Sequence, residues 1–123
     1  MFHINNSGII SLNRGDSFKV PLFINMGTDT EPVRVDLHKF PYLEVYMGIM
    51  LPHQTFETAI IKKKFTVDNA NDKGDVVVNI EPAETMNLRP GKYFYEIKAR
   101  LDDPIEGEYV RTVINKTQFL VLR

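Results

Sequence analysis

The chain has 123 residues, 43% of them hydrophobic and 25% charged, and a formal net charge of −1. This length suits one domain over residues 1–123 with a single core. The absence of cysteine excludes disulfides and thiolate chemistry, and the near-neutral charge gives no field that would attract nucleic acid or an anionic membrane. No apolar run reaches the ~18 residues of a spanning helix, and residues 1–6 lack a signal-peptide pattern. We therefore expect a soluble protein made in the cytoplasm.

Period-two alternation of apolar and polar residues dominates the first half of the chain, as strands with one buried face require. It predicts a strand over residues 17–26, and Pro21 should place that strand at a sheet edge or bulge, because proline lacks an N–H donor. Further strands are predicted over 43–49 and 57–65. The lysines at 62–64 end the last of these, where charge resists unwanted pairing at an edge.

The second half of the chain alternates turn-forming segments with strands. The predicted elements, in order, are a polar loop at 68–75, a short strand at 76–80, one helical turn at 81–88, a long strand at 93–101, a hairpin connection at 102–107 and a last strand at 109–122. The last strand should be bulged near Asn115 and Lys116. About seven antiparallel strands without a sustained helical period predict an all-β sandwich with Greek-key connections. A barrel is the alternative.

One local pattern makes this prediction more specific. Pro90 and Gly91 form a turn signal directly before Tyr-x-Tyr at the start of a long strand. In immunoglobulin-like sandwiches, a tyrosine two residues before an inward core position often bonds back to the backbone of the preceding corner. Tyr93 fits this role, and Tyr95 would take the core place of an antibody cysteine. The alternative is two ordinary core tyrosines, and both interpretations make Tyr93, Pro90 and Gly91 structural.

Residues able to carry chemistry are few and scattered. The histidines His3, His38 and His53 are far apart, and Asp36 with His38 supplies too few ligands for zinc. The aspartates at 102–103 fall in a turn, where we expect solvated charges rather than an acid–base pair. The serines lie outside any Gly-x-Ser-x-Gly elbow, and the glycines form no phosphate-binding loop. We predict no catalytic residue, no cofactor, no metal site and no enzymatic activity.

Two short patterns have a structural explanation beside a functional one. Arg14-Gly15-Asp16 is a tripeptide that some adhesion receptors recognise, but it falls where a turn must join two strands, and Gly15 permits such a turn. The lysine run at 62–64 has no aromatic stacking platform beside it for nucleic acid. We predict a structural turn at the first and a solvated strand edge at the second.

Large apolar side chains also occur out of phase with the predicted core positions. If they are exposed together they form a partner-binding patch, and if not they thicken the core. These residues are Phe23, Tyr42, Tyr46, Met50, Val77 and Phe94. All except Val77 are predicted interface residues.

Two segments stand in a recognisable order. Residues 13–18, Asn-Arg-Gly-Asp-Ser-Phe, lead into an alternating strand, and residues 88–98, Leu-Arg-Pro-Gly-Lys-Tyr-Phe-Tyr-Glu-Ile-Lys, precede 110–114 and a terminal apolar strand at 119–122. In this order they resemble the small immunoglobulin-like domains of tailed-bacteriophage virions, such as the N-terminal domain of baseplate upper proteins and related head-fibre or tail-attached modules. The apolar, methionine-bearing segment at 42–65 departs from that pattern.

The resemblance implies a structural protein of a phage virion: an adaptor, a decoration or a fibre- or baseplate-anchoring module. Its implied partners are other virion proteins of the capsid, fibre or baseplate, with self-association into a homo-oligomer and without nucleic acid or membrane. No fibre stalk or receptor-binding domain follows the predicted sandwich, so we expect an assembly piece. The alternative is a carbohydrate- or cell-surface-binding β-sandwich module, although the chain lacks tryptophan, the usual stacking platform for sugars.

Overall fold

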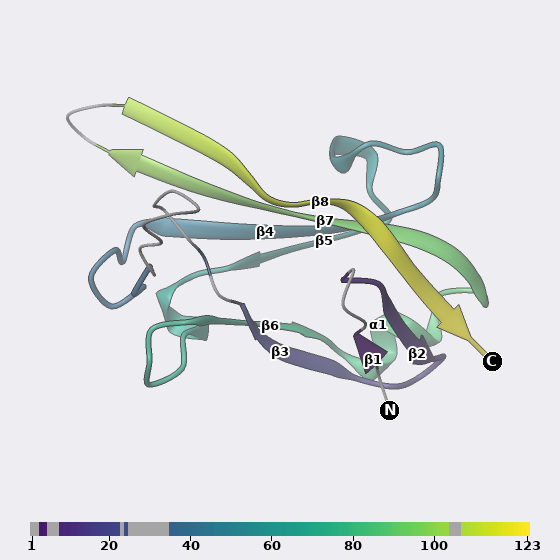
Figure 1. Cartoon of the computed structure of the whole chain (residues 1–123). Coiled ribbons are helices and arrows are strands. Elements are labelled where there is room, and N and C mark those ends of the chain that lie inside the picture. The colour runs from purple at the N-terminus through teal and green to yellow at the C-terminus, as the bar shows by residue number, and fades with distance from the viewer. Residues whose placement is uncertain (1–2, 5–7, 23, 25–34, 104–106) are drawn as a thin grey trace.

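The chain forms an all-β fold with one short α-helix, as predicted (Figure 1). The computed structural model describes residues 3–4, 8–22, 24, 35–103 and 107–123. The strands within these ranges are β1 (His3–Ile4), β2 (Ile10–Asn13), β3 (Phe18–Leu22), β4 (Leu43–Met50), β5 (Ile61–Phe65), β6 (Val76–Ile80), β7 (Gly91–Asp103) and β8 (Gly107–Leu122). The helices are the 3-10 turns η1 (Phe56–Thr58) and η2 (Val67–Asn69) and the α-helix α1 (Pro82–Met86).

The described strands form two sheets, a six-stranded sheet with the order β1-β2-β8-β7-β4-β5 and a two-stranded sheet, β3-β6. Every neighbouring pair is antiparallel except β2 with β8, which is parallel and places Ile10 beside Phe119. The prediction that all strands are antiparallel was therefore wrong. No hairpin joins β2 to β8, because most of the chain lies between them, so chain connectivity did not impose an antiparallel pairing.

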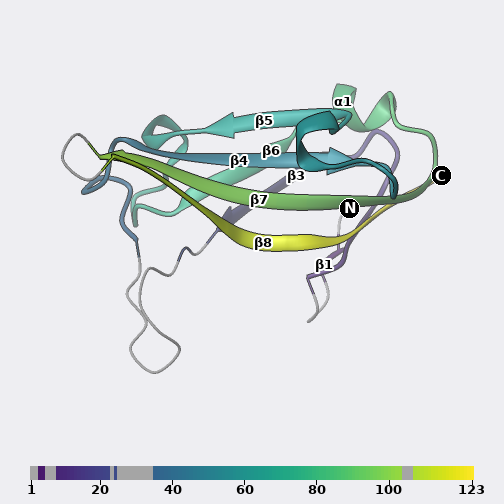
Figure 2. The same ribbon diagram turned by 90° about the horizontal axis from the view of Figure 1, so that it is seen from above.

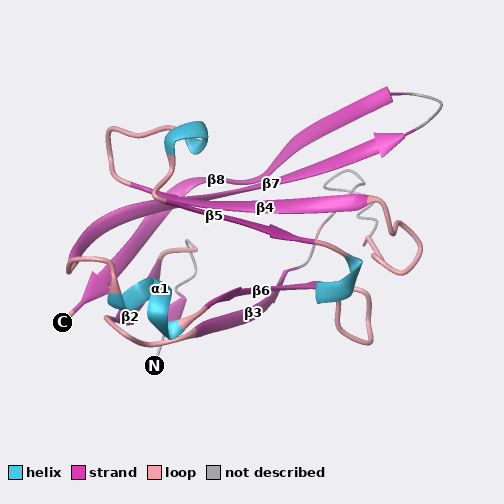
Figure 3. Ribbon diagram, turned by 180° about the vertical axis from the view of Figure 1, so that it is seen from behind, coloured by secondary structure: helices cyan, strands magenta, loops and turns pink. Residues whose placement is uncertain are grey.

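The small sheet lies against one face of the large sheet, and the core lies between them (Figure 3). The period-two alternation decides which side chains of a strand point into the core. In β4 and β6 the buried positions alternate with half-buried ones over most of each strand. Members of the core come from both sheets and include Phe18, Val78, Ile80, Val45, Met47, Ile49, Tyr95, Ile97 and Phe119. Burial of each such side chain contributes about 1.5–3 kcal/mol relative to exposure.

The edges of the sheets are partly as predicted. Pro21 lies in the two-stranded sheet, at an edge, where a missing donor is tolerated. The strand expected at 57–65 begins only at Ile61, because η1 occupies 56–58. β5 lies at an edge of the large sheet and exposes Lys62 and Lys64, as predicted, but Lys63 turns inward. Its ammonium donates to Asn79 Oδ1 at 3.0 Å and to Glu84 Oε1 at 2.8 Å, and this joins β5 to β6 and α1.

The predicted helical turn is present as α1, and the Arg14-Gly15-Asp16 segment packs against it. The buried hydroxyl of Thr85 accepts the N–H of Gly15 at 3.1 Å and lies 2.7 Å from the carbonyl oxygen of Asp16. Arg14 Nε donates to the carbonyl oxygen of Met86 at 2.8 Å. Gly15 has a φ of +89°, a value that favours glycine. The tripeptide is therefore a structural turn.

Two tyrosines fix the start of β7. The hydroxyl of Tyr93 donates to the carbonyl oxygen of Arg89 at 2.8 Å, which is the corner hydrogen bond expected from the sequence. The buried Tyr95 donates to the carbonyl oxygen of Gly8 at 2.6 Å, and burial raises the pKa of its phenol. These bonds connect the middle of the large sheet to the corner before β7 and to the segment before β2.

Candidate functional site: the outer face of the large sheet

The outer face is the surface of the six-stranded sheet that is turned away from β3 and β6. Because Val45, Met47 and Ile97 point into the core, the residues between them point outward. In β4 the outward positions are Glu44, Tyr46, Gly48 and Met50, and in β7 they are Phe94, Glu96, Lys98 and Arg100. The pairing of β4 with β5 adds Lys62 and Lys64 to this face.

The loop between β4 and β5, residues 51–60, folds back over the outer face (Figures 1 and 3). The ring of Phe56 sits on Gly48, where an added Cβ would lie 2.9 Å from ring atom Cδ2. Any larger residue at 48 would therefore displace the ring. Backbone and side-chain bonds between Leu51 and Gln54, of 3.0 and 2.9 Å, turn the loop back toward the sheet.

A bulge in β8 provides the second attachment of this loop. The register of β7 and β8 shifts between Tyr95 and Lys98, opposite the segment that holds Asn115 and Lys116, as the sequence predicted. The ammonium of Lys116 donates to the carbonyl oxygens of Pro52 and Gln54, both at 3.0 Å, and lies 5.3 Å from the centre of the Phe94 ring. One lysine thus attaches the β4–β5 loop to the last strand.

The predicted interface residues do not form one exposed patch. Met50 is only 1% exposed and Phe94 is half-buried below Lys116, because the β4–β5 loop covers this part of the sheet. Tyr46 is half-buried on the outer face, whereas Tyr42 is 72% exposed just before β4. Phe23 lies outside the described residues. The patch hypothesis was therefore wrong for Met50, whereas the interface roles of Tyr42, Tyr46 and Phe94 stay predictions.

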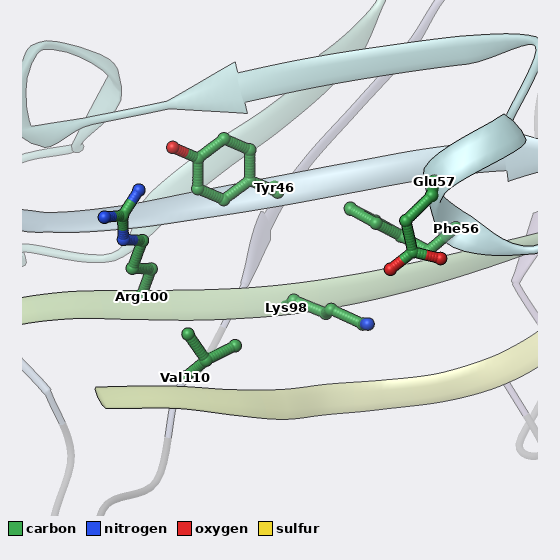
Figure 4. A pocket seen from close by; sticks show the side chains of 6 residues that line it. All are labelled: Tyr46, Phe56, Glu57, Lys98, Arg100 and Val110. Carbon is green, nitrogen blue, oxygen red and sulfur yellow. The ribbon is translucent and has the colours of Figure 1, made fainter. Parts of the chain in front are cut away.

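One accessible part of the outer face is a groove of about 350 Å³ between η1 and the strands β4, β7 and β8 (Figure 4), and a smaller hollow of about 250 Å³ adjoins it under the β4–β5 loop. We call the larger one the outer groove. Its lining residues are Tyr46, Phe56, Glu57, Lys98, Arg100 and Val110. Val110 is 54% exposed and pairs with Arg100 across the β7–β8 ladder, so both belong to the same face. The alternation in the sequence already assigns Lys98 and Arg100 to the outward phase, but no sequence signal indicated the Phe56 and Glu57 side of the groove.

Charge is unevenly distributed over the groove. Lys98 Nζ lies 4.8 Å from the centre of the Phe56 ring and 3.8 Å from Glu96 Oε1. Figure 4 shows Lys98 and Arg100 following one another along β7, with Glu57 on the η1 side. Hydrogen bonds from its own backbone N–H and from Thr55, together with nearby lysines, lower the pKa of Glu57, so this carboxyl is ionised at neutral pH. The groove therefore presents cations from its strand and a carboxylate from its rim.

Beyond the groove, Glu44 is already paired. Its carboxylate contacts the ammonium of Lys64 and accepts a hydrogen bond from the hydroxyl of Tyr46 at 3.2 Å. The hydrogen bond from Lys64 lowers the pKa of Glu44. Across the described outer face the cations Lys62, Lys64, Lys98, Arg100 and Lys116 outnumber the carboxylates Glu44, Glu57 and Glu96. Among the described side chains this face therefore carries more cations than carboxylates, on a chain whose formal net charge is −1.

Asp36 and His38, the residues considered as metal ligands, instead form hydrogen bonds that hold a loop. The backbone N–H of His38 donates to Asp36 Oδ1 at 2.9 Å, and His38 Nε2 lies 3.0 Å from the carbonyl oxygen of Asn71. Within the described ranges, no three histidine, aspartate or glutamate side chains gather as they would around a metal ion. The described part of the chain also contains no helix long and apolar enough to cross a membrane.

The fold and the groove together define a class, an all-β domain that carries a cationic, aromatic-lined groove on its larger sheet. No protein-family model, no curated protein and no solved structure matches the chain. A functional assignment must therefore start from the strand order, the corner contacts and the outer groove.

Proposed function

We propose that this chain is a non-enzymatic structural module with an immunoglobulin-like fold, and that it acts in the virion of a tailed bacteriophage by assembling with other proteins. It would be an adaptor, a decoration or an anchoring piece of a fibre or baseplate. Its partners would be other virion proteins and further copies of itself.

The observation that carries the proposal is the strand order. In immunoglobulin-like domains, strands C, F and G share one sheet, variable-type domains add C′ to it, and strands B and E belong to the other sheet. The order β8-β7-β4-β5 in one sheet and β3-β6 in the other fits G-F-C-C′ and B-E, in the same sequence along the chain. The strand before β3 would then be an added first strand beside G.

The corner before β7 gives independent support. An immunoglobulin-like domain commonly has a tyrosine near the start of strand F whose hydroxyl bonds to backbone a few residues upstream, two positions before a core residue. Tyr93 donates to the carbonyl oxygen of Arg89, and Tyr95, two residues later, is 3% exposed and packs edge-on against Phe119. These contacts and the strand order favour the same fold by separate routes.

The phage part of the proposal is supported by the order of the two recognisable segments. The first, residues 13–18, forms the turn from the large sheet to the small one, and the second, residues 88–98, forms the corner and the first half of β7. Both are framework elements of the fold, so their resemblance to virion modules supports a shared scaffold. An assembly role also suits a small domain that presents a groove on an open sheet face.

The test is a protein census of purified particles by quantitative mass spectrometry, made from the phage or prophage whose genome encodes the chain. We expect the chain to copurify with capsid and tail proteins in a fixed ratio through a density gradient. An abundant non-structural protein of the same lysate serves as the control for carry-over. If the chain is depleted from particles as completely as that control, the virion proposal fails.

A second candidate, from another class, is a carbohydrate- or cell-surface-binding module. The observation that favours it is the exposure of two aromatic side chains close together in sequence, Phe40 at 38% and Tyr42 at 72%. Aromatic rings in such positions stack on sugar rings. A glycan array with the native chain and a Tyr42→Ala variant tests this, and binding that the variant loses would favour the second candidate.

A further inference from the structure

We propose that the outer groove binds an extended, acidic segment of a partner protein, with alternate carboxylates of that segment placed on Lys98 and Arg100. This inference rests on the proposed assembly function and names the surface and the chemistry of the partner. It is argued from the spacing, the walls and the charge of the groove.

The spacing favours an extended chain. Lys98 and Arg100 are alternate residues of one strand, so their backbone positions are roughly 6.6–6.8 Å apart. Alternate residues of an extended peptide have the same separation. A partner with carboxylates at every second position would therefore place one on each cation without bending. Arginine also offers a planar donor pair that matches a carboxylate.

The walls provide apolar contact between the charges. Phe56 closes the η1 side and Val110, 54% exposed, closes the β8 side, while the ring of Tyr46 lies over β4 (Figure 4). Val110 is among the most exposed large apolar side chains of the described residues. A partner side chain that covers it would remove apolar surface from water, which acidic residues alone would not do.

The remaining charges set an orientation. Glu57 lies at the η1 side of the groove and is ionised, and Glu96 lies 3.8 Å from Lys98. Glu44 lies opposite Arg100 in the register of β4 and β7, but its carboxylate is paired with Lys64. An acidic segment is therefore repelled more strongly at the η1 side than at the Arg100 side. The carboxylates of the partner should concentrate near Arg100, and a neutral or basic residue should follow next to Glu57.

The experiment measures the fluorescence anisotropy of a labelled peptide, Gly-Glu-Val-Glu-Val-Gly-Gly, titrated with the whole chain at low salt. Two further peptides replace both glutamates by glutamine or by lysine. We expect the glutamate peptide to bind most tightly and the lysine peptide not to bind. Loss of two exposed ion pairs corresponds to a weakening of about 2- to 30-fold, so the glutamine peptide should bind more weakly by a factor in that range.

Matched charge variants locate the site. The double variant Lys98→Gln/Arg100→Gln should weaken binding of the glutamate peptide by the same factor. The control Lys19→Gln/Lys73→Gln removes the same charge from two exposed lysines outside the outer face and should stay within twofold of the native chain. Backbone amide shifts in NMR spectra of the native chain provide a second measurement that needs no variant. The peptide should shift amides of β4 and β7 around Tyr46, Lys98 and Arg100.

Three outcomes would overturn the proposal. The first is equal binding of the glutamate and glutamine peptides, and the second is equal weakening by both double variants. The third is a shift pattern centred on the small sheet. A single-stranded oligonucleotide that binds more tightly than the peptide would assign the groove to nucleic acid instead. The particle census tests the proposed function independently of the peptide experiments. If the chain is present in particles but fails the peptide tests, the proposed function stands and only the proposed binding surface is refuted.

Discussion

Replacement of Gly48 by alanine tests whether the β4–β5 loop is held against the sheet by direct packing. The added Cβ would lie 2.9 and 3.0 Å from two atoms of the Phe56 ring and 3.3 Å from the Cβ of Ala59. The ring must move, and overpacking of this kind costs about 1–3 kcal/mol. Alanine is better than glycine in a strand by roughly 0.5–1 kcal/mol, which offsets part of that cost. We expect Gly48→Ala to lower the free energy of unfolding by up to about 2.5 kcal/mol.

The measurement is urea unfolding followed by far-ultraviolet circular dichroism, since the chain has no tryptophan. The matched background is the Phe56→Ala variant, which lacks the two ring atoms that lie nearest to the added Cβ. There Gly48→Ala should be neutral or stabilising by up to about 1 kcal/mol, because only the strand preference remains. The two backgrounds should therefore differ by about 1–3 kcal/mol, the size of coupling seen between residues in contact. An equal effect of Gly48→Ala in both backgrounds would refute the packing of Phe56 on Gly48.

Three further predictions concern contacts that hold the framework. Tyr93→Phe should lower the free energy of unfolding by about 0.5–1.5 kcal/mol in urea, since it removes the bond to the carbonyl of Arg89. In NMR titrations the pKa of Glu84 should lie below 4.5 and rise in Lys63→Met. Burial raises this pKa, and the ammonium of Lys63 together with the backbone N–H of Glu81 outweighs burial. Because the folded pKa is lowered, ionised Glu84 stabilises the native chain above the unfolded value, and this stabilisation is lost as pH falls through the folded pKa. The variant should therefore lose less stability on acidification. Lys116→Met should speed amide hydrogen exchange in the β4–β5 loop and leave the amides of β7 unchanged; unchanged exchange in the loop would contradict that attachment.

The strands were predictable because their signal is local. Alternation assigned the inward side chains of β4, β6 and β7, and Pro21 correctly indicated an edge. The bulge opposite Tyr95 and the bond of Tyr93 also followed from short segments. Each of these features depends on residues within a few positions of one another, where the backbone preferences of single residues decide the geometry.

The contacts that define the candidate site could not be read in this way. Met50 is outward by alternation and yet buried, because the loop that follows it folds back and is attached to Lys116 of the distant β8. Lys63 is the middle residue of a lysine run and yet turns inward to Glu84, and β2 pairs in parallel with a strand at the other end of the chain. Such outcomes depend on which segments meet in space, and alternation within one strand contains no information about its neighbours.

The parallel pairing of β2 with β8 has a practical consequence for handling the protein. The N–H of Arg14 donates to the carbonyl oxygen of Leu122 at 2.8 Å, so the last residues are fixed beside the turn that leads to β3. Seen from above, residue 123 lies at the far end of the molecule from the β7–β8 hairpin (Figure 2). Val110 and Arg100, which line the outer groove, belong to the hairpin half of these strands. A tag or sensor surface joined after residue 123 should therefore leave the groove facing the solution.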